Sequence, residues 1–214
     1  MRAVIFVNGT ITDYATLAGW LRVDDFLIGA DGGTVHCLAL GRHPDVIVGD
    51  LDSVDPREVV RLAAMGVQIE RHPPAKNETD LELALERAQR QGADEVLLLG
   101  ALGGRLDQTL GNLLILVQRE WPFALLIGEG DQLAQVVRSG ELLHLRAPVG
   151  GTVSAIPLSA TVTGITYTGL EYPLIDATLH LGSTRGMSNV VAVLPATIQI
   201  SQGLLLVVQT VVNQ

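Results

Sequence analysis

The feature that most constrains the fold is a series of six short, mostly apolar runs in the first 130 residues. Such runs, separated by helical segments, are typical of parallel strands buried on both faces, because the helical crossovers cover both sides of the sheet. We therefore predict a mostly parallel α/β sheet domain. Its strands are expected at residues 4–7, 26–28, 46–48, 67–69, 96–99 and 123–127.

Two helices can be placed between these strands from local signals. Thr79-Asp80-Leu81-Glu82 has the form of a capping box and precedes an apolar stripe at helical spacing, so a helix should begin there. A second helix is predicted over residues 106–119. It should end before Trp121-Pro122, because proline disfavours helical geometry in the residue before it.

After about residue 139 the pattern changes to short runs of Thr, Val, Ile and Leu interrupted by Gly, Pro and Ser. Short strands at this spacing are typical of a β-sandwich or barrel. We therefore predict an α/β domain at residues 1–139 and an all-β domain at residues 140–214. The strands of the second domain are expected at residues 141–145, 152–157, 160–167, 177–181, 190–194 and 203–211.

Composition and charge exclude several classes of protein. The 214 residues are 48% hydrophobic, which is ample for a packed core, and the formal charge of −9 disfavours a nonspecific nucleic-acid binder. Cys37 is the only cysteine, so no intrachain disulfide can form. No apolar stretch approaches the ~18 residues needed to span a bilayer, and the N-terminus has no signal-peptide pattern. We expect a cytoplasmic protein that binds neither nucleic acid nor membrane.

Two carboxylates follow the third apolar run, in Gly49-Asp50-Leu51-Asp52-Ser53. Strand side chains alternate, so Asp50 and Asp52 should point the same way and repel unless a cation compensates them. Mg²⁺ suits such a pair, because it takes one or two protein carboxylates together with substrate phosphates. An ordinary Asp/Ser-rich turn explains the pentapeptide equally well.

Polar or glycine-rich segments also follow the other runs, and ligands of open parallel sheets gather at the carboxyl ends of the strands. Asp31-Gly32-Gly33 after the second run would let a nucleotide or phosphate approach the backbone, unless it is only a tight turn. Lys76 after the fourth run is a candidate phosphate ligand, with a solvated loop lysine as the alternative. Thr79 and Asp80 could cap the helix and bind a ligand at the same time.

The fifth run leads into a glycine-rich bend that carries Arg105 and Asp107. The guanidinium fork of Arg105 suits phosphate, and Asp107 could join a metal site or orient a hydroxyl. A surface ion pair at a helix start is the competing interpretation. The sequence has no Walker A motif, no GxGxxG fingerprint, and no metal-ligand spacing among its histidines. Together the strand ends favour Mg²⁺-assisted phosphoryl transfer.

Four segments resemble, in order and spacing, the motifs of the thiamine pyrophosphokinase family. They are Ala30-Asp31-Gly32-Gly33, Gly49-Asp50-Leu51-Asp52-Ser53, Lys76-Asn77-Glu78-Thr79-Asp80 and Gly103-Gly104-Arg105-Leu106-Asp107-Gln108. In the β-rich part, the segments at residues 169–174 and 182–189 resemble that family's thiamine-binding region.

The resemblance implies an enzyme that converts ATP and thiamine into AMP and thiamine diphosphate, and a homodimer with sites between subunits. It implies that Mg²⁺ is held by Asp50, Asp52 and Asp80. It implies ATP binding by Asp31, Gly32, Gly33, Lys76, Thr79 and Arg105. It implies a catalytic set of Asp52, Asp80, Arg105 and Asp107, and thiamine contacts by Tyr172, Ser188 and Asn189.

Three positions depart from the family pattern. Tyr172 stands where many members have Trp, Gly186 where a first serine is common, and Gln108 where bacterial members often have His. A missing hydroxyl at Gly186 bears on the preference for thiamine, because one substrate hydrogen bond is lost. Two alternatives therefore remain: a pyrophosphokinase for another hydroxymethyl heteroaromatic such as a pterin, and a non-catalytic sensor of nucleotide or thiamine.

Overall fold

A computed structural model describes residues 1–118 and 121–211. The chain divides into two compact units, Met1–Gly130 and Asp131–Gln214. This division lies nine residues before the boundary expected from the sequence, because residues 132–138 form a strand, β7 (Gln132–Arg138), that pairs along its whole length with β14 (Leu204–Thr210). The segment therefore belongs with the β-rich unit.

The first unit is built on a parallel sheet, as the sequence predicted. Its strands lie in the order β6-β5-β1-β2-β3-β4, and neighbouring strands are parallel. The order reverses at β1, which lies between β2 and β5. The strands are β1 (Arg2–Phe6), β2 (Phe26–Ala30), β3 (Val46–Gly49), β4 (Gln68–Arg71), β5 (Glu95–Leu99) and β6 (Ala124–Glu129).

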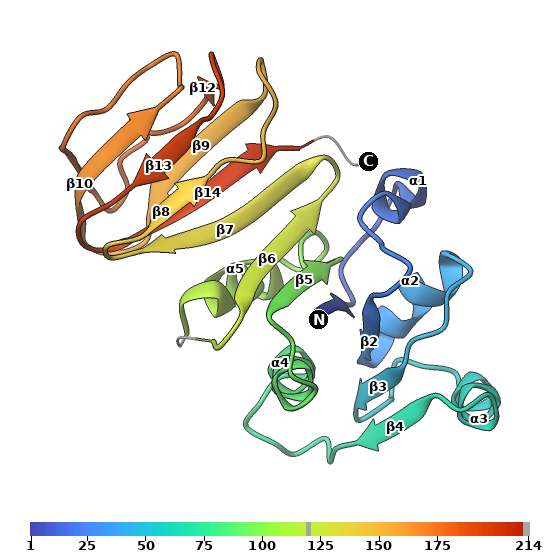
Figure 1. The fold of residues 1–214 in the computed structure, drawn as a ribbon. Coiled ribbons are helices and arrows are strands. Elements are labelled where there is room, and N and C mark those ends of the chain that lie inside the picture. Colours follow the sequence, from blue (N-terminus) through green and yellow to red (C-terminus); the bar gives the residue numbers. More distant parts are fainter. Residues whose placement is uncertain (119–120, 212–214) are drawn as a thin grey trace. The chain divides into compact units, whose positions relative to one another are not determined.

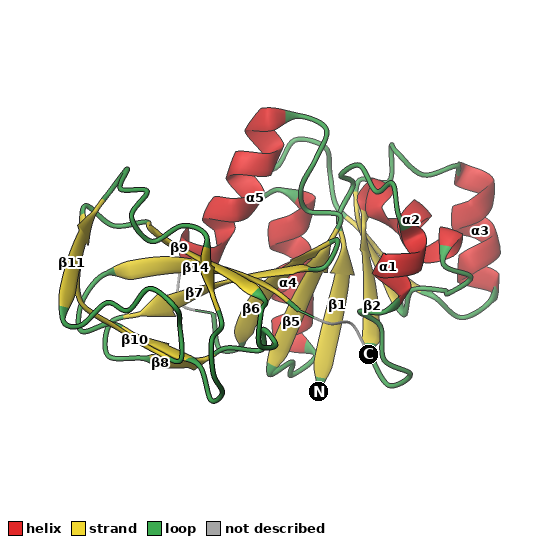
Figure 2. Ribbon diagram, turned by 90° about the horizontal axis from the view of Figure 1, so that it is seen from above, coloured by secondary structure: helices red, strands yellow, loops and turns green. Residues whose placement is uncertain are grey.

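Helices cover both faces of this sheet. Helix α2 contacts β1 and β2, whereas α4 contacts β1, β2 and β3, and Figure 1 shows the two helices on opposite sides of β2. Figure 2 shows the same elements coloured by type. The helices are α1 (Tyr14–Ala18), α2 (Thr34–Ala39), α3 (Pro56–Ala64), α4 (Asp80–Arg90) and α5 (Leu106–Gln118), and a 3-10 turn, η1 (Asp31–Gly33), precedes α2.

Helix α4 begins where the capping box predicted. Thr79 Oγ1 accepts a hydrogen bond from the Glu82 amide at 3.2 Å, and the Glu82 carboxylate accepts one from the Thr79 amide at 2.8 Å. Helix α5 begins at Leu106, as predicted, and is described to Gln118; the expected end at residue 119 lies outside the described residues. The capping box thus placed the start of α4 correctly, and the predicted start of α5 is correct as well.

The core of the first unit lies along its central strands. Residues 3–6 of β1 and 96–99 of β5 are almost completely buried, as expected for strands covered on both faces. Each large apolar side chain buried in this way contributes about 1.5–3 kcal/mol. Cys37 of α2 is also fully buried, and burial raises the pKa of its thiol to about 12.

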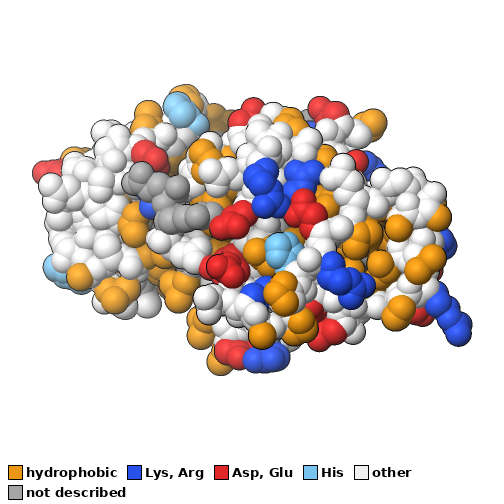
Figure 3. Space-filling view, turned by 90° about the horizontal axis from the view of Figure 1, so that it is seen from below, with side chains coloured by type: hydrophobic (Ala, Val, Ile, Leu, Met, Phe, Trp, Pro, Cys, Tyr) orange, Lys and Arg blue, Asp and Glu red, His pale blue; other side chains and the backbone are white. Residues whose placement is uncertain are grey.

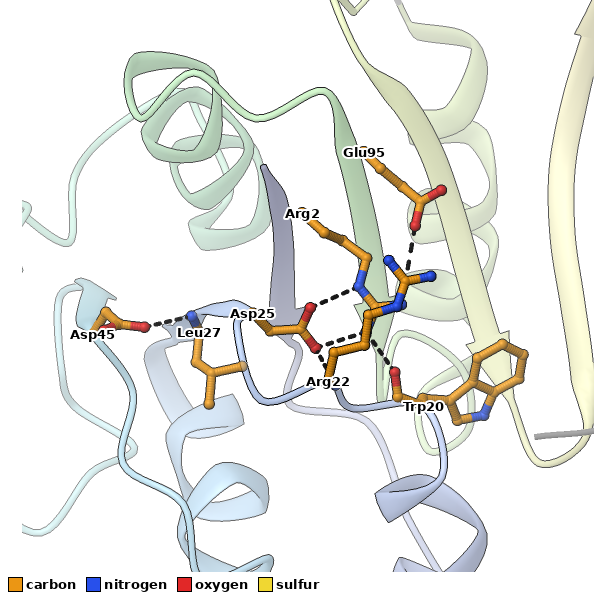
Figure 4. A network of polar contacts seen from close by, with 7 residues as sticks. All are labelled: Arg2, Trp20, Arg22, Asp25, Leu27, Asp45 and Glu95. Carbon is orange, nitrogen blue, oxygen red and sulfur yellow. Dashed lines mark hydrogen bonds and ion pairs between the residues drawn. The ribbon is translucent and has the colours of Figure 1, made fainter. Parts of the chain in front are cut away.

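A buried ion pair lies at the amino edge of the sheet, where β1 and β2 begin (Figure 4). Asp25 accepts two hydrogen bonds from the Arg2 guanidinium at 2.7 and 2.6 Å, and one from the Arg22 amide at 2.7 Å. Arg2 also donates to the Trp20 carbonyl at 2.6 Å and lies 3.9 Å from Glu95. The charges of Arg2 and Asp25 thus compensate each other.

The second unit is a sandwich of two antiparallel sheets, which confirms the predicted all-β architecture. The strands of one sheet run in the order β12-β9-β14-β7, and those of the other in the order β11-β10-β13-β8. Side chains from both sheets, among them Val153, Val207, Val162 and Ile198, form one apolar core. The remaining strands are β8 (Leu142–His144), β9 (Thr152–Pro157), β10 (Thr161–Thr168), β11 (Ala177–His180), β12 (Asn189–Val190) and β13 (Thr197–Gln199).

One predicted strand of this unit is wrong in its extent. The strand expected at residues 190–194 reduces to β12, because the next residues turn back and both Ala192 and Val193 donate their amides to the Gly169 carbonyl.

Within residues 1–118 and 121–211, no helix is both long and apolar enough to cross a membrane. On the face drawn in Figure 3, acidic and basic side chains lie next to one another, so their charges partly neutralise there.

Candidate active site

The loops at the carboxyl edge of the parallel sheet surround a cavity of about 810 Å³. The loops that follow β1, β2, β3, β4 and β5 all contribute lining residues, as does one side of α5. An open α/β sheet binds ligands at this edge, where the strand order reverses. The sequence prediction that several strand ends meet at one place is therefore correct in its geometry.

Three carboxylates converge at this edge. One oxygen from each of Asp31, Asp50 and Asp52 can be chosen so that all three lie within 4.8 Å of one another. Asp31 is buried, and its Oδ1 has no hydrogen-bond partner among the described residues. Like charges held this close repel, and an unpartnered buried carboxylate oxygen is costly. A hard divalent cation fits this donor set, because it binds carboxylate oxygens and neutralises their repulsion.

The approach of Asp50 and Asp52 has a different cause from the one expected. Strand β3 ends at Gly49, so alternation along a strand is the wrong explanation. The two residues lie in a turn in which the Asp52 amide donates to Asp50 Oδ1 at 3.3 Å. Leu51 between them has a left-handed backbone with φ of 66°. The turn, rather than the pleat, brings the carboxylates together.

Asp80 lies beside this group but pairs with a cation of its own. Its Oδ1 is 2.8 Å from Lys76 Nζ, and the Lys76 side chain is only 11% exposed. A Cβ atom at Gly49 would lie 3.0 Å from Cβ of Asp31 and 3.1 Å from Oδ1 of Asp80. Glycine at this position thus leaves room for two carboxylates from different loops.

The charge of Lys76 is stabilised by its surroundings. Burial by itself lowers the pKa of Lys76, but the hydrogen bond to Asp80 and the nearby acidic charges outweigh it, so the pKa lies above its ordinary value. Lys76 therefore remains protonated at neutral pH. A fixed ammonium beside the acidic group is suited to bind an anionic ligand such as a phosphate.

The glycines after β2 have a packing role that the sequence did not reveal. A Cβ atom at Gly33 would lie 1.9 Å from the Phe6 carbonyl oxygen, and one at Gly32 would lie 2.5 Å from the Asn8 side chain. Both glycines are buried, and the cavity lining includes Asp31 and Asn8 but neither glycine. They let the turn pack against the end of β1, and this close packing fixes the position of Asp31.

Arg105 and Asp107 form the exposed ion pair that was the alternative interpretation. Their side chains meet at 2.6 Å and are 69% and 67% exposed. The hydrogen bond from Arg105 is the main reason why the pKa of Asp107 is lowered. Asp107 lines the cavity, as do Thr79 and Gln108, whereas Arg105 does not.

Sequence reasoning missed three residues at this edge. Asn8 and Gly9 line the cavity directly after β1, and Asn112 of α5 donates from Nδ2 to the Ala101 carbonyl at 2.7 Å. The signal for Asn8 was available, because it follows the first apolar run just as Asp31 follows the second. Asn112 lies in the interior of a helix, and no local motif marks it.

The second unit holds the other three predicted site residues. Asn189 is buried, and its side chain accepts from the Tyr172 amide at 3.0 Å and donates to the Tyr172 carbonyl at 2.7 Å. It also accepts from the Val190 amide at 2.9 Å. Tyr172 is 62% exposed, and Ser188 is exposed with φ of 58°. Asn189 therefore holds the backbone that presents the Tyr172 ring.

Comparison with known proteins matches both units to one family. The family model "Thiamin pyrophosphokinase, catalytic domain" matches residues 19–124, and "Thiamin pyrophosphokinase, vitamin B1 binding domain" matches residues 142–205. The chain belongs to the thiamin pyrophosphokinase family. The resemblance seen in the sequence motifs is thereby confirmed.

Individual thiamin pyrophosphokinases agree with this assignment. Thiamine pyrophosphokinase of Bacillus subtilis is 29% identical over 195 residues, which are 91% of this chain and 91% of that protein. Thiamine pyrophosphokinase 1 of rice is 30% identical over 69% of this chain and 59% of its own length. The crystal structure of the B. subtilis enzyme has a TM-score of 0.87 and covers 99% of both chains at 27% identity. The Geobacillus thermodenitrificans enzyme has a TM-score of 0.83 at 29% identity, and the match covers 100% of this chain and 99% of that one.

The structure explains one departure from the thiamin pyrophosphokinase pattern. The Ala155 amide donates to the Gly186 carbonyl at 2.8 Å, and a Cβ atom at Gly186 would lie only 2.2 Å from the Ala155 carbonyl oxygen. A serine cannot occupy this position without a shift of the backbone. The glycine is therefore required by the path of the chain in this protein.

Proposed function

We propose that this protein transfers the pyrophosphoryl group of ATP to the hydroxyl group of thiamine, giving thiamine diphosphate and AMP. The observation that carries the proposal is the group of Asp31, Asp50 and Asp52 beside Lys76, in a chain that both domain models of the family match. Carboxylates that hold a cation, together with a fixed ammonium, are what polyphosphate transfer requires.

Asp50 and Asp52 are the proposed Mg²⁺ ligands. Asp31, whose buried Oδ1 has no hydrogen-bond partner within the described part of the chain, is proposed as a third ligand. Asp80 is proposed as a neighbour that the resemblance also assigns to the metal. When bound, Mg²⁺ supplies charge neutralisation to the polyphosphate and so favours attack by a hydroxyl. The turn at Leu51 and the absence of a side chain at Gly49 allow the carboxylates to approach one another before any ligand binds.

Lys76, Arg105 and Asp107 are proposed to orient the reacting groups. Lys76 binds a phosphate oxygen without losing Asp80, because an ammonium has three donors. Arg105 can release part of its ion pair with Asp107 and bind a phosphate instead. This costs little free energy, because both side chains are exposed. In the reaction, the hydroxyl oxygen of thiamine forms a bond to the β-phosphorus and loses its proton, the bond from that phosphorus to the oxygen shared with the α-phosphorus breaks, and AMP leaves with that oxygen. Thr79 lines the cavity at the start of α4 and is proposed to contact ATP.

Thiamine is proposed to bind against Tyr172 and Ser188 of the second unit. Tyr172 presents an exposed ring that can stack on a heteroaromatic, and Asn189 fixes its backbone. We also propose a homodimer, as the resemblance implies, and light scattering combined with size-exclusion chromatography tests it. A mass of a single chain at micromolar concentration would contradict the dimer.

Product identification tests the proposed reaction. Purified protein, Mg²⁺, ATP and thiamine are incubated, and the nucleotide and thiamine products are separated by chromatography. AMP and thiamine diphosphate in equal amounts are expected. ADP and thiamine monophosphate would contradict the proposal, because they indicate transfer of a single phosphoryl group. A matched reaction with Asp52→Ala should give neither product.

The altered position at Gly186 makes a second acceptor worth testing. A substrate panel that includes a hydroxymethylpterin measures kcat/KM for each acceptor under the same conditions. We expect thiamine to be preferred, because the exposed ring of Tyr172 remains available for stacking. A higher kcat/KM for the pterin would replace thiamine as the acceptor and leave the pyrophosphoryl transfer intact.

A further inference from the structure

The turn between Asp50 and Asp52 has an unusual backbone. Leu51 has φ of 66°, a left-handed conformation that residues with a Cβ atom rarely adopt and that glycine or asparagine adopts more readily. Among the described residues of the first unit, the other non-glycine residue with positive φ is Asp31, at 43°. Both left-handed residues thus lie within the acidic group or between two of its members. Strained backbone of this kind persists only where the surroundings hold it.

The side chain of Leu51 shows what holds the turn. Leu51 is 5% exposed and belongs to an apolar cluster with Ile47 of β3 and with Val59 and Leu62 of α3. Val54 and Val67 complete the buried cluster. A glycine at position 51 would suit the backbone but would have no side chain to insert into this cluster. Leucine at position 51 therefore has an unfavourable backbone conformation, but its side chain is anchored in the apolar cluster.

This anchor determines where the neighbouring carboxylates point. The left-handed residue turns the chain, and the Asp52 amide then donates to Asp50 at 3.3 Å. With Leu51 fixed in the cluster, both carboxylates stay within 4.8 Å of the Asp31 carboxylate despite their mutual repulsion.

We propose that Leu51 is a positioning residue, whose strained backbone and buried side chain together hold Asp50 and Asp52 in a geometry ready to bind a divalent cation. The inference rests on the proposed function, because it assigns a role toward the proposed metal site. It predicts that metal affinity depends on Leu51 more strongly than on other residues of the same cluster, although Leu51 itself offers no ligand atom.

Four variants separate this role from simple packing. Leu51→Gly removes the anchor, and Leu51→Ile keeps the apolar bulk but branches at Cβ, which opposes positive φ. Leu51→Met keeps both the bulk and the unbranched Cβ. Leu62→Ala is the matched control, because it removes a completely buried side chain from the same cluster on α3, away from the turn.

The measurement is the affinity for Mn²⁺ alone, from the electron paramagnetic resonance signal of free Mn²⁺, with thermal unfolding followed in parallel. Leu51→Gly and Leu51→Ile should weaken Mn²⁺ binding by roughly 10- to 100-fold, the loss typical when a group that orients metal ligands is removed. Leu51→Met should bind like the wild type. Leu62→Ala should lower the unfolding temperature but leave the Mn²⁺ affinity of the folded protein unchanged.

Two outcomes overturn the inference alone: wild-type affinity in both Leu51→Gly and Leu51→Ile, or an equal loss of affinity in Leu62→Ala. If Leu51→Gly does not fold, the comparison of Leu51→Ile with Leu51→Met decides, because their side chains are similar in volume. A wild-type protein that turns over substrates but binds no Mn²⁺ overturns the proposed metal site as well. The failure of the proposed reaction is recognised separately, by the absence of AMP with the wild type.

Discussion

The two ends of strand β2 carry aspartates that are equally buried but differ in their hydrogen-bond partners. Asp25, just before the strand, and Asp31, just after it, are each 7% exposed. Asp25 accepts three hydrogen bonds, two of them from Arg2 (Figure 4). Asp31 has an oxygen with no partner among the described residues and two further carboxylates beside it.

This difference separates a structural use of charge from a functional one. A buried carboxylate that is fully paired contributes to holding the fold, and removing one partner leaves the other charge uncompensated. A buried carboxylate that lacks a partner weakens the fold unless a ligand completes it. At the amino edge Arg2 and Asp25 therefore compensate each other, whereas at the carboxyl edge a buried carboxylate oxygen is left for the ligand that we propose.

The largest effect is expected at the amino edge. Asp25→Ala should lower the free energy of unfolding by about 3–5 kcal/mol, because it leaves the buried Arg2 guanidinium unpaired. Chemical denaturation measures this loss. The turnover per folded molecule should be unchanged. The double variant Arg2→Met/Asp25→Leu should recover much of the stability, and a double variant as unstable as Asp25→Ala would argue against an electrostatic cause.

The matching substitution at the carboxyl edge should have the opposite profile. Asp31→Asn keeps the shape of the side chain and removes one of three repelling charges, so the free energy of unfolding in metal-free buffer should stay the same or rise. Turnover should fall on the order of 100-fold or more, as when a group that stabilises transition-state charge is removed. A destabilised Asp31→Asn with full activity would reverse the contrast between the two edges.

A smaller effect is expected when the ammonium group of Lys76 at the carboxyl edge is removed. Lys76→Met keeps much of the side-chain bulk but loses the ammonium, so the KM for ATP should rise about tenfold, which corresponds to ~1.4 kcal/mol. Because Asp80 loses its partner, Mn²⁺ binding should become tighter at the same time. Steady-state kinetics and a Mn²⁺ titration measure the two changes. Equal weakening of both ligands would indicate a collapsed site instead of a lost charge.

The smallest effect concerns pH and the loop after β1. The buried His36 ring contacts the Tyr14 hydroxyl at 2.8 Å and the Gly9 carbonyl at 2.9 Å. Burial lowers the pKa of His36, and the hydrogen bond to Gly9 opposes this only in part. The unfolded chain takes up the proton near its ordinary pKa of about 6.5 while the folded chain does not, so stability should fall as the pH drops from 7.5 through that value.

His36→Asn should flatten this dependence of the unfolding free energy on pH, because it removes the group that titrates differently in the two states. His43→Asn, at an exposed position of the same unit, is the matched control for the substitution itself. Denaturation curves at pH 7.5, 6.5 and 5.5 measure the slope. A slope that persists in His36→Asn would assign the pH dependence to other groups.

The sequence predicted what depends on local pattern. The apolar runs placed the six parallel strands, and the capping box placed the start of α4, because both signals lie within a few neighbouring residues. Strand β7 was not predicted, because its half-polar sequence resembles neither a buried apolar run nor a helix. It forms by pairing with β14, which lies far along the chain. The division of the chain after Gly130 differs from the expected boundary for the same reason.

The candidate site follows the same rule. The convergence of Asp31, Asp50 and Asp52 was predictable, because parallel strands end at a common edge. The left-handed turn at Leu51 was not, because leucine carries no preference for that conformation. Nor could the sequence show that the side-chain amide of Asn189 binds the backbone of Tyr172, since that contact joins strand β12 to a separate loop.

The chemistry of Cys37 gives this protein a practical advantage. The only thiol of the sequence is fully buried and has a pKa of about 12, so almost none of it is present as the reactive thiolate at neutral pH. Cysteines introduced at exposed positions, such as Val23 of the first unit and Ile175 of the second, would then react selectively with fluorescent probes. Such probes can be attached to either unit without removal of the native cysteine.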